Sequence, residues 1–186
     1  MFDILKFGGQ NEKYIKKLSS LTNGTASRYE IWYLQNPPTG NNTVSISTST
    51  ATKLAGSAIS YGGVSTVTPW GAETSGLAAT NNATPNLNLT TTANNSWIHN
   101  FFEWGSSTPN WTSGTNNSVR IIDESTGKPN GSNTDTVTSN LITSTGIGTY
   151  NVSGTLSDAI QWVGFARELV PQTTAFSQGY VLKAFK

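Results

Sequence analysis

Residues 97–103 of this 186-residue chain read WIHNFFE, and this stretch decides the fold class. Aromatic and β-branched side chains fit the pleated surface of a sheet, so we expect a strand over residues 95–103. Segments of the same character lie on both sides of it, separated by loops rich in Gly, Pro, Asn and Ser. In all, the pattern predicts about ten strands, at residues 29–34, 43–49, 53–61, 86–90, 95–103, 118–122, 134–139, 148–152, 159–169 and 179–185.

Short strands separated by turns at roughly regular spacing are typical of an antiparallel sandwich or barrel rather than of βαβ units. A β-helix would need a fixed sequence repeat, and we find none. Pro69, Gly71 and Gly76 predict a loop between the third and fourth of these strands. The expected fold is therefore all-β, an antiparallel, jelly-roll-like β-sandwich of about ten strands.

The composition excludes several classes of protein. Charged residues make up 11% of the chain, against roughly 25% in typical soluble domains. A net charge of +1 provides no basic surface for nucleic acid, and no apolar run is long enough to span a membrane. With no cysteine there is neither a disulfide framework nor a thiolate metal site. Ser, Thr and Asn dominate the polar strand faces, and such an uncharged surface is compatible with packing against copies of the same chain.

Three regions are expected along the chain. Residues 1–27 form an N-terminal arm or hairpin that joins the sandwich, residues 28–171 the sandwich body, and residues 172–186 a C-terminal strand or arm. Residues 11–21 have near-helical apolar spacing, but residues 6–7 and 14–18 can also pair as a hairpin, which we favour. The N-terminus lacks the basic start and continuous apolar segment of a signal peptide.

The candidates for catalysis are weak. His99 is the only histidine, and Glu103 would stand about 13 Å from it along one strand, because a strand rises about 3.3 Å per residue. No G-x-S-x-G nucleophile turn and no EF-hand-like calcium loop occur. Glu168, next to Arg167, fits one half of an ion pair better than a catalytic acid. We therefore expect no enzymatic activity, no catalytic residue, no metal ligand and no cofactor.

Tryptophans outside the predicted strands are the candidates for a binding surface. Exposed aromatic rings beside amide groups can stack on sugars, although aromatic side chains more often pack inside proteins or in interfaces. We favour packing, and keep the set as a possible interface or glycan platform: Trp70, Trp104, Trp111 and Asn110, with Asn116 and Asn117 nearby. Trp32, Trp97 and Trp162 lie within predicted strands and are expected in the core.

The segment at residues 32–44, WYLQNPPTGNNTV, resembles one that recurs in Ser/Thr/Gly-rich β-sandwich modules. These modules occur in large bacterial surface proteins and in phage structural proteins. The resemblance continues in YGGV at residues 61–64, TP at 68–69 and WVGFARELVP at 162–171. It implies a sandwich with a structural or adhesive role and carries no catalytic residues.

The chain departs from that pattern at its start. The modules have further strands before an aromatic-Gly-Gly segment, which here is Phe7-Gly8-Gly9. A sheet lacking those strands would have an open edge, which the C-terminal segment could fill in its own chain or in a neighbour. We favour exchange with a neighbour, and its candidate residues are Tyr180, Val181, Leu182 and Phe185.

These observations predict a non-enzymatic structural protein of a multi-copy assembly, a phage virion component such as a capsid decoration, fibre or spike protein. Its partners would be copies of itself and other virion or surface structural proteins. The alternative is a carbohydrate-binding or adhesion module on a virion or cell surface, with glycans as partners. A glycan-degrading enzyme would instead require two acidic residues that face each other across a groove.

Overall fold

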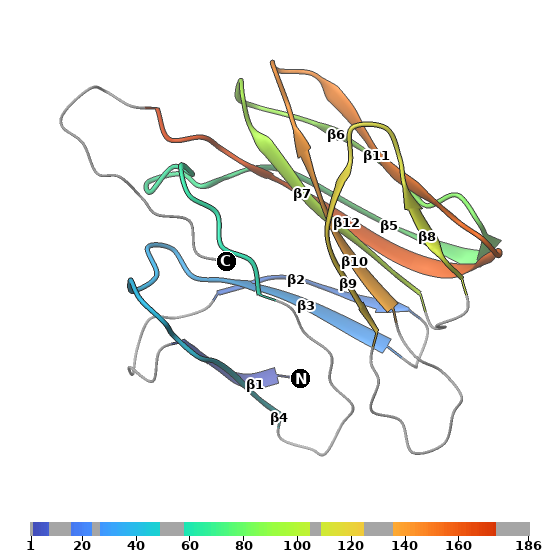
Figure 1. Cartoon of the computed structure of the whole chain (residues 1–186), viewed down its shortest axis with the longest axis horizontal. Helices are drawn as coiled ribbons and strands as arrows, with labels where there is room; N and C mark the ends of the chain where they lie inside the picture. Colours follow the sequence, from blue (N-terminus) through green and yellow to red (C-terminus); the bar gives the residue numbers. More distant parts are fainter. Residues whose placement is uncertain are drawn as a thin grey trace.

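A computed structural model describes residues 2–7, 16–23, 27–48, 58–104, 109–124 and 136–173 of the chain (Figure 1). Within these residues every regular element is a strand, and every strand pairing is antiparallel. The strands are β1 (Phe2–Phe7), β2 (Lys16–Asn23), β3 (Ser27–Tyr33), β4 (Val44–Thr48), β5 (Trp70–Asn82), β6 (Asn86–Thr90), β7 (Trp97–Trp104), β8 (Trp111–Ser113), β9 (Ser118–Glu124), β10 (Thr136–Thr143), β11 (Thr149–Leu156) and β12 (Ile160–Leu169).

The eight strands from β5 to β12 have the pairing of a jelly roll. Along the chain, the first of these strands pairs with the last and the pairing continues inward: β5 with β12, β6 with β11, and β7 with β10. One sheet has the order β5-β12-β7-β10-β9 and the facing sheet the order β6-β11-β8 (Figure 1). A long hairpin folded over on itself gives this arrangement, so the predicted all-β, jelly-roll-like sandwich is confirmed.

One strand departs from that pattern. β9 would extend the smaller sheet beyond β8, but it pairs instead with β10 in the larger sheet. Within the described residues, β8 therefore has β11 as its one sheet neighbour. The β8–β9 connection consequently crosses from one sheet to the other at this end of the sandwich.

The core lies between the two sheets. Alternate residues of the strands point into it, as the period of two in a strand requires. Its buried side chains are Leu87, Leu89, Ile98, Phe102, Trp104, Ile142, Val152, Leu156, Trp162 and Ala166.

β2 contacts β12, and Figure 1 shows β2 and β3 on the face of the larger sheet that points away from β6 and β11. Phe101 and Phe165 stack on this second face with ring centroids 5.8 Å apart, and both are buried. This explains why residues 162–166 form a continuous buried run rather than an alternating one.

Two predictions of elements are wrong. Pro69, Gly71 and Gly76 predicted a loop, but β5 begins at Trp70 and is 13 residues long. Its glycines lie where a neighbouring side chain comes too close for any other residue, not in turns. A Cβ on Gly71 would meet the Glu168 carboxylate, and one on Gly76 would lie 2.8 Å from Leu87. The short strand β8, in turn, was not predicted.

The prediction of an N-terminal hairpin is wrong, because the strands in this region pair with other partners. β1 pairs with β4, and β2 pairs with β3, so neither the hairpin between residues 6–7 and 14–18 nor a helix through residue 21 forms. β3 follows β2 after only three residues, and a short connection closes at a smaller entropic cost than a long one. Residues 58–61 of the predicted strand at 53–61 are not in a strand, and residues 53–57 lie outside the described residues, as does the segment with Tyr180, Val181, Leu182 and Phe185.

Candidate functional site

Trp104 is not available as a glycan platform. It ends strand β7, has no exposed surface and stacks on Trp111, with ring centroids 5.7 Å apart and planes at 20°. Its expected place in or near a loop is therefore corrected: the aromatic strand continues one residue further and places this ring in the core.

Trp111 is half-buried against the same core. Its ring lies 5.3 Å from that of Phe102, and its indole N–H donates to Ser113 Oγ at 2.9 Å. Gly154 leaves the room that the indole occupies, since a Cβ there would lie 2.7 Å or less from three of its ring atoms. Trp111 therefore packs against the core of the sandwich.

Asn110, which precedes it, is exposed and is tied to the loop before β12. Its backbone N–H donates to Ser157 Oγ at 3.0 Å, and its carbonyl accepts from Ser157 N–H at 3.0 Å. These bonds use only the backbone of Asn110.

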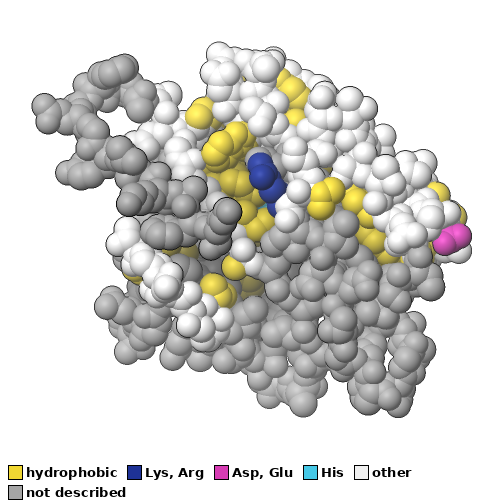
Figure 2. All heavy atoms as spheres, in the orientation of Figure 1, with side chains coloured by type: hydrophobic (Ala, Val, Ile, Leu, Met, Phe, Trp, Pro, Cys, Tyr) yellow, Lys and Arg dark blue, Asp and Glu magenta, His cyan; other side chains and the backbone are white. Residues whose placement is uncertain are grey.

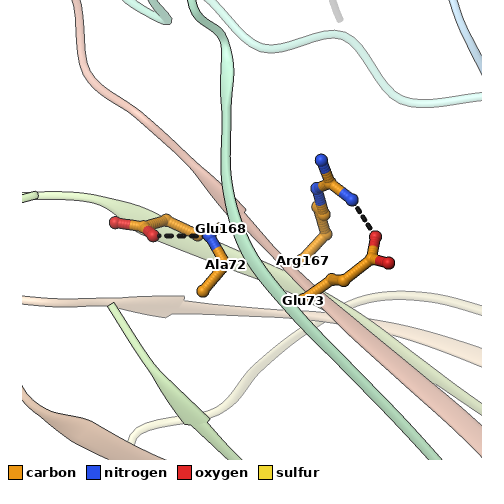
Figure 3. Close-up of polar contacts among 4 residues, drawn as sticks. All are labelled: Ala72, Glu73, Arg167 and Glu168. Carbon is orange, nitrogen blue, oxygen red and sulfur yellow. Dashed lines mark hydrogen bonds and ion pairs between the residues drawn. The ribbon is translucent and has the colours of Figure 1, made fainter. Parts of the chain in front are cut away.

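Trp70 is half-buried and engaged by two neighbours. The ring of Tyr33 meets it edge-on with centroids 4.6 Å apart, and the Arg167 guanidinium lies 5.6 Å from its ring centre. Arg167 also forms an ion pair with Glu73 of the neighbouring strand (Figure 3). Of the predicted core tryptophans, Trp162 is buried, whereas Trp32 and Trp97 are half-buried.

His99 is paired with a tyrosine rather than with an acid. Its Nδ1 lies 2.7 Å from Tyr61 Oη. Burial lowers the pKa of His99 to about 4. Burial also raises the pKa of Tyr61 to about 12, although the positive charge of Arg120 opposes this rise. Both groups are thus neutral near pH 7, and the contact is a neutral hydrogen bond.

The sequence suggested that Glu168 forms half of an ion pair, but among the described residues its partners are uncharged N–H and O–H groups. Its carboxylate has no exposed surface and accepts backbone N–H groups from Ala72 (2.9 Å), Thr92 (2.9 Å) and Ala93 (3.0 Å), the first of which is drawn in Figure 3. The hydroxyls of Thr92 (2.8 Å) and Ser96 (2.7 Å) donate to it as well. Burial alone would raise the pKa of Glu168, but these hydrogen bonds together hold it below its usual value. The carboxylate ties β12 to β5 and to the loop before β7.

A hollow on the surface lies beside the start of β9. It has a volume of about 520 Å³, within the range of roughly 300–1,000 Å³ of small-ligand sites. The turn before β9, the end of β10 and the start of β11 line it. We call it the Arg120 hollow, and its lining residues are Asn116, Asn117, Ser118, Arg120, Thr143, Thr145 and Tyr150.

Figure 2 shows one face of the molecule, on which, among the described residues, hydrophobic side chains gather around one basic group and most other side chains are uncharged. Sequence reasoning named Asn116 and Asn117 only as neighbours of Trp111, and missed the rest of the hollow. One signal was available: Arg120 is the first arginine or lysine after Lys53.

No protein-family model, curated protein or solved structure matches this chain. Among the described residues, no three His, Asp or Glu side chains gather as metal ligands would. The described segments also contain no helix of the length and apolarity needed to cross a bilayer.

Proposed function

We propose that this chain is a non-enzymatic structural protein that assembles in many copies, as a component of a phage virion. The observation that carries the proposal is the edge of the larger sheet. β5 is 13 residues long, and within the described residues its one sheet neighbour is β12. A long edge strand is a template for pairing with another chain unless charges, prolines or bulges prevent it.

The register of β5 with β12 shifts near both ends of the strand, but residues 73–78 between these shifts pair regularly and have few of the other protections. β5 contains no lysine or proline, and Arg167 neutralises Glu73, its one charged residue. Leu77, near its middle, keeps 57% of its surface exposed. Two copies can pair antiparallel through this edge around a two-fold axis, so that Leu77 of one copy comes close to Leu77 of the next.

Light scattering on the purified full chain over a hundredfold range of concentration tests this proposal. We expect a dimer or larger assembly, which Leu77→Lys converts to monomer by placing like charges opposite each other. Val67→Lys is the matched control, since Val67 is 85% exposed but lies outside the strands. A monomeric wild-type chain at every concentration would contradict the proposal.

A carbohydrate-binding or adhesion module is the second candidate function. The observation that favours it is the Arg120 hollow, whose amides, hydroxyls and tyrosine ring are groups that bind sugars. The two functions are compatible, because the hollow and the β5 edge involve different strands.

A further inference from the structure

We propose that the Arg120 hollow binds a saccharide that carries a carboxylate. This inference rests on the second candidate function and specifies its ligand. Because β9 departs from the jelly-roll pattern, the β8–β9 turn passes from one sheet to the other. The hollow lies where this turn meets the end of β10 and the start of β11.

The turn is held in place by its own hydrogen bonds. Asn117 N–H donates to the Gly114 carbonyl at 3.2 Å, and Asn116 has a φ of 63°, a left-handed conformation that asparagine adopts more readily than most residues. The Asn117 side chain donates to the Thr115 carbonyl at 3.1 Å and accepts from the buried Asn100 amide at 3.5 Å. The amide of Asn117 is thus positioned before any ligand arrives, which reduces the entropic cost of binding.

Tyr150 lines the same hollow from the start of β11, and its hydroxyl is held by Gly146. Its hydroxyl donates to the Gly146 carbonyl at 2.8 Å and accepts from the Gly146 N–H at 3.3 Å. Because the hydroxyl is occupied, Tyr150 offers mainly its ring, which can pack on the C–H face of a sugar. The side chains of Asn116, Ser118, Thr143 and Thr145 are exposed and can exchange hydrogen bonds with sugar hydroxyls.

The charge of the hollow specifies the ligand further. Arg120 is exposed, and among the residues whose side chains the structure describes it has no ion-pair partner and no acidic residue lines the hollow. A guanidinium binds a carboxylate through two parallel hydrogen bonds, which makes the contact both strong and directional. A cationic ligand would be repelled, and an apolar ligand would leave the hydroxyls and amides without partners.

A single guanidinium also argues against a polyanion. Nucleic acids and sulfated polymers are bound by arrays of basic residues, and this chain has a net charge of only +1. One carboxylate among many hydroxyls matches one arginine among amides, hydroxyls and a tyrosine ring. Sialic acids and uronic acids both have this chemistry.

Isothermal titration of the full chain with two acidic saccharides and their neutral counterparts tests the inference. The probes are 3′-sialyllactose against lactose, and digalacturonate against its methyl ester. We expect at least one acidic saccharide to bind about tenfold or more tightly than its neutral counterpart, as a charged hydrogen bond implies. Arg120→Gln should abolish this preference, and Arg120→Lys should restore part of it.

Two further measurements complete the design. Arg167→Gln removes an arginine outside the hollow and should leave both affinities unchanged, and far-UV circular dichroism should show that Arg120→Gln is folded. Equal binding of acidic and neutral saccharides, or an acid preference that survives Arg120→Gln, would overturn the inference but leave a carbohydrate-binding function standing. Tighter binding of dextran sulfate than of either acidic saccharide would also overturn it. Binding of none of these probes at millimolar concentration would overturn both.

Discussion

Ser96 Oγ donates a hydrogen bond of 2.7 Å to Glu168 Oε1 across 72 residues of sequence, and both residues are buried. Because the carboxylate also accepts three backbone N–H groups, its loss would leave several buried donors without an acceptor. We expect Glu168→Ala to lower the free energy of unfolding by at least about 2 kcal/mol, since each such donor costs roughly 1–3 kcal/mol. Urea denaturation measures this change.

The neighbouring acid provides the matched control. Glu73 is half-exposed and pairs with Arg167, so Glu73→Gln should cost less than about 1 kcal/mol. Equal losses in the two variants would show that Glu168 acts as an ordinary surface acid.

The single histidine gives the fold a pH dependence that one residue can account for. The pKa of His99 is about 4 in the folded protein, below its ordinary value of 6.5, so the unfolded chain binds more protons between these values. The contribution of His99 to stability is complete above about pH 6.5 and is lost as the pH falls toward 4. At its largest it is about 3 kcal/mol, because one pKa unit corresponds to about 1.4 kcal/mol.

Because there is only one imidazole, an NMR titration of its C–H protons measures this pKa directly. We expect a midpoint near 4, and we expect His99→Gln to flatten the stability profile between pH 4 and 6.5. A midpoint above 6 would contradict the desolvation of His99 where it contacts Tyr61. The lowered pKa of Glu168 acts in a separate window, because its contribution is lost only below its unfolded pKa of about 4.3.

Gly71 should tolerate no side chain. A Cβ there would meet the Glu168 carboxylate and would lie 2.8 Å from Thr92 Oγ1, so Gly71→Ala forces this cluster apart. We expect a loss of about 1–3 kcal/mol, the usual cost of overpacking, in thermal or urea denaturation. At Gly146 the nearest atom would be 3.8 Å away, so Gly146→Ala should be close to neutral.

Trp104→Ala should act on stability rather than on ligand affinity. It removes a fully buried ring that stacks on Trp111, and such truncations cost about 3–5 kcal/mol. Denaturant unfolding followed by circular dichroism would measure the loss, with Val67→Ala as an exposed control. Weaker saccharide binding with unchanged stability would contradict the buried position of Trp104.

The sequence predicted the class of fold better than the details that create its sites. Alternation and turn residues identify β6, β7, β11 and β12, because a strand and its bounding loop leave local signals. β5 was not predicted, because glycines such as Gly71 and Gly76 occur both in turns and at strand positions that must leave room for a neighbour. Here they leave room for Glu168 and Leu87. The choice between these two roles depends on residues that are distant in the sequence.

The Arg120 hollow could not be predicted from the sequence for a related reason. It depends on β9 joining β10 rather than β8, and strand partnership between sheets has no local signature. Arg120 and Asn117 can be found in the sequence, but Tyr150 becomes their neighbour only through the topology. Trp104 was expected in or near a loop because the predicted strand ended at residue 103, whereas the observed strand includes it and buries its ring.

The pairing of β5 with β12 also constrains how the protein is made. β12 is the last strand described, yet it lies between β5 and β7 and holds them together. On the ribosome, β5 and β7 therefore emerge many residues before the strand that joins them. Such non-local pairing is typical of domains that fold in milliseconds to seconds rather than microseconds. Synthesis proceeds at about 5–20 residues per second. Until residue 169 is added, β5 has no partner on either side, so a newly made chain is then most prone to pair prematurely with its neighbours.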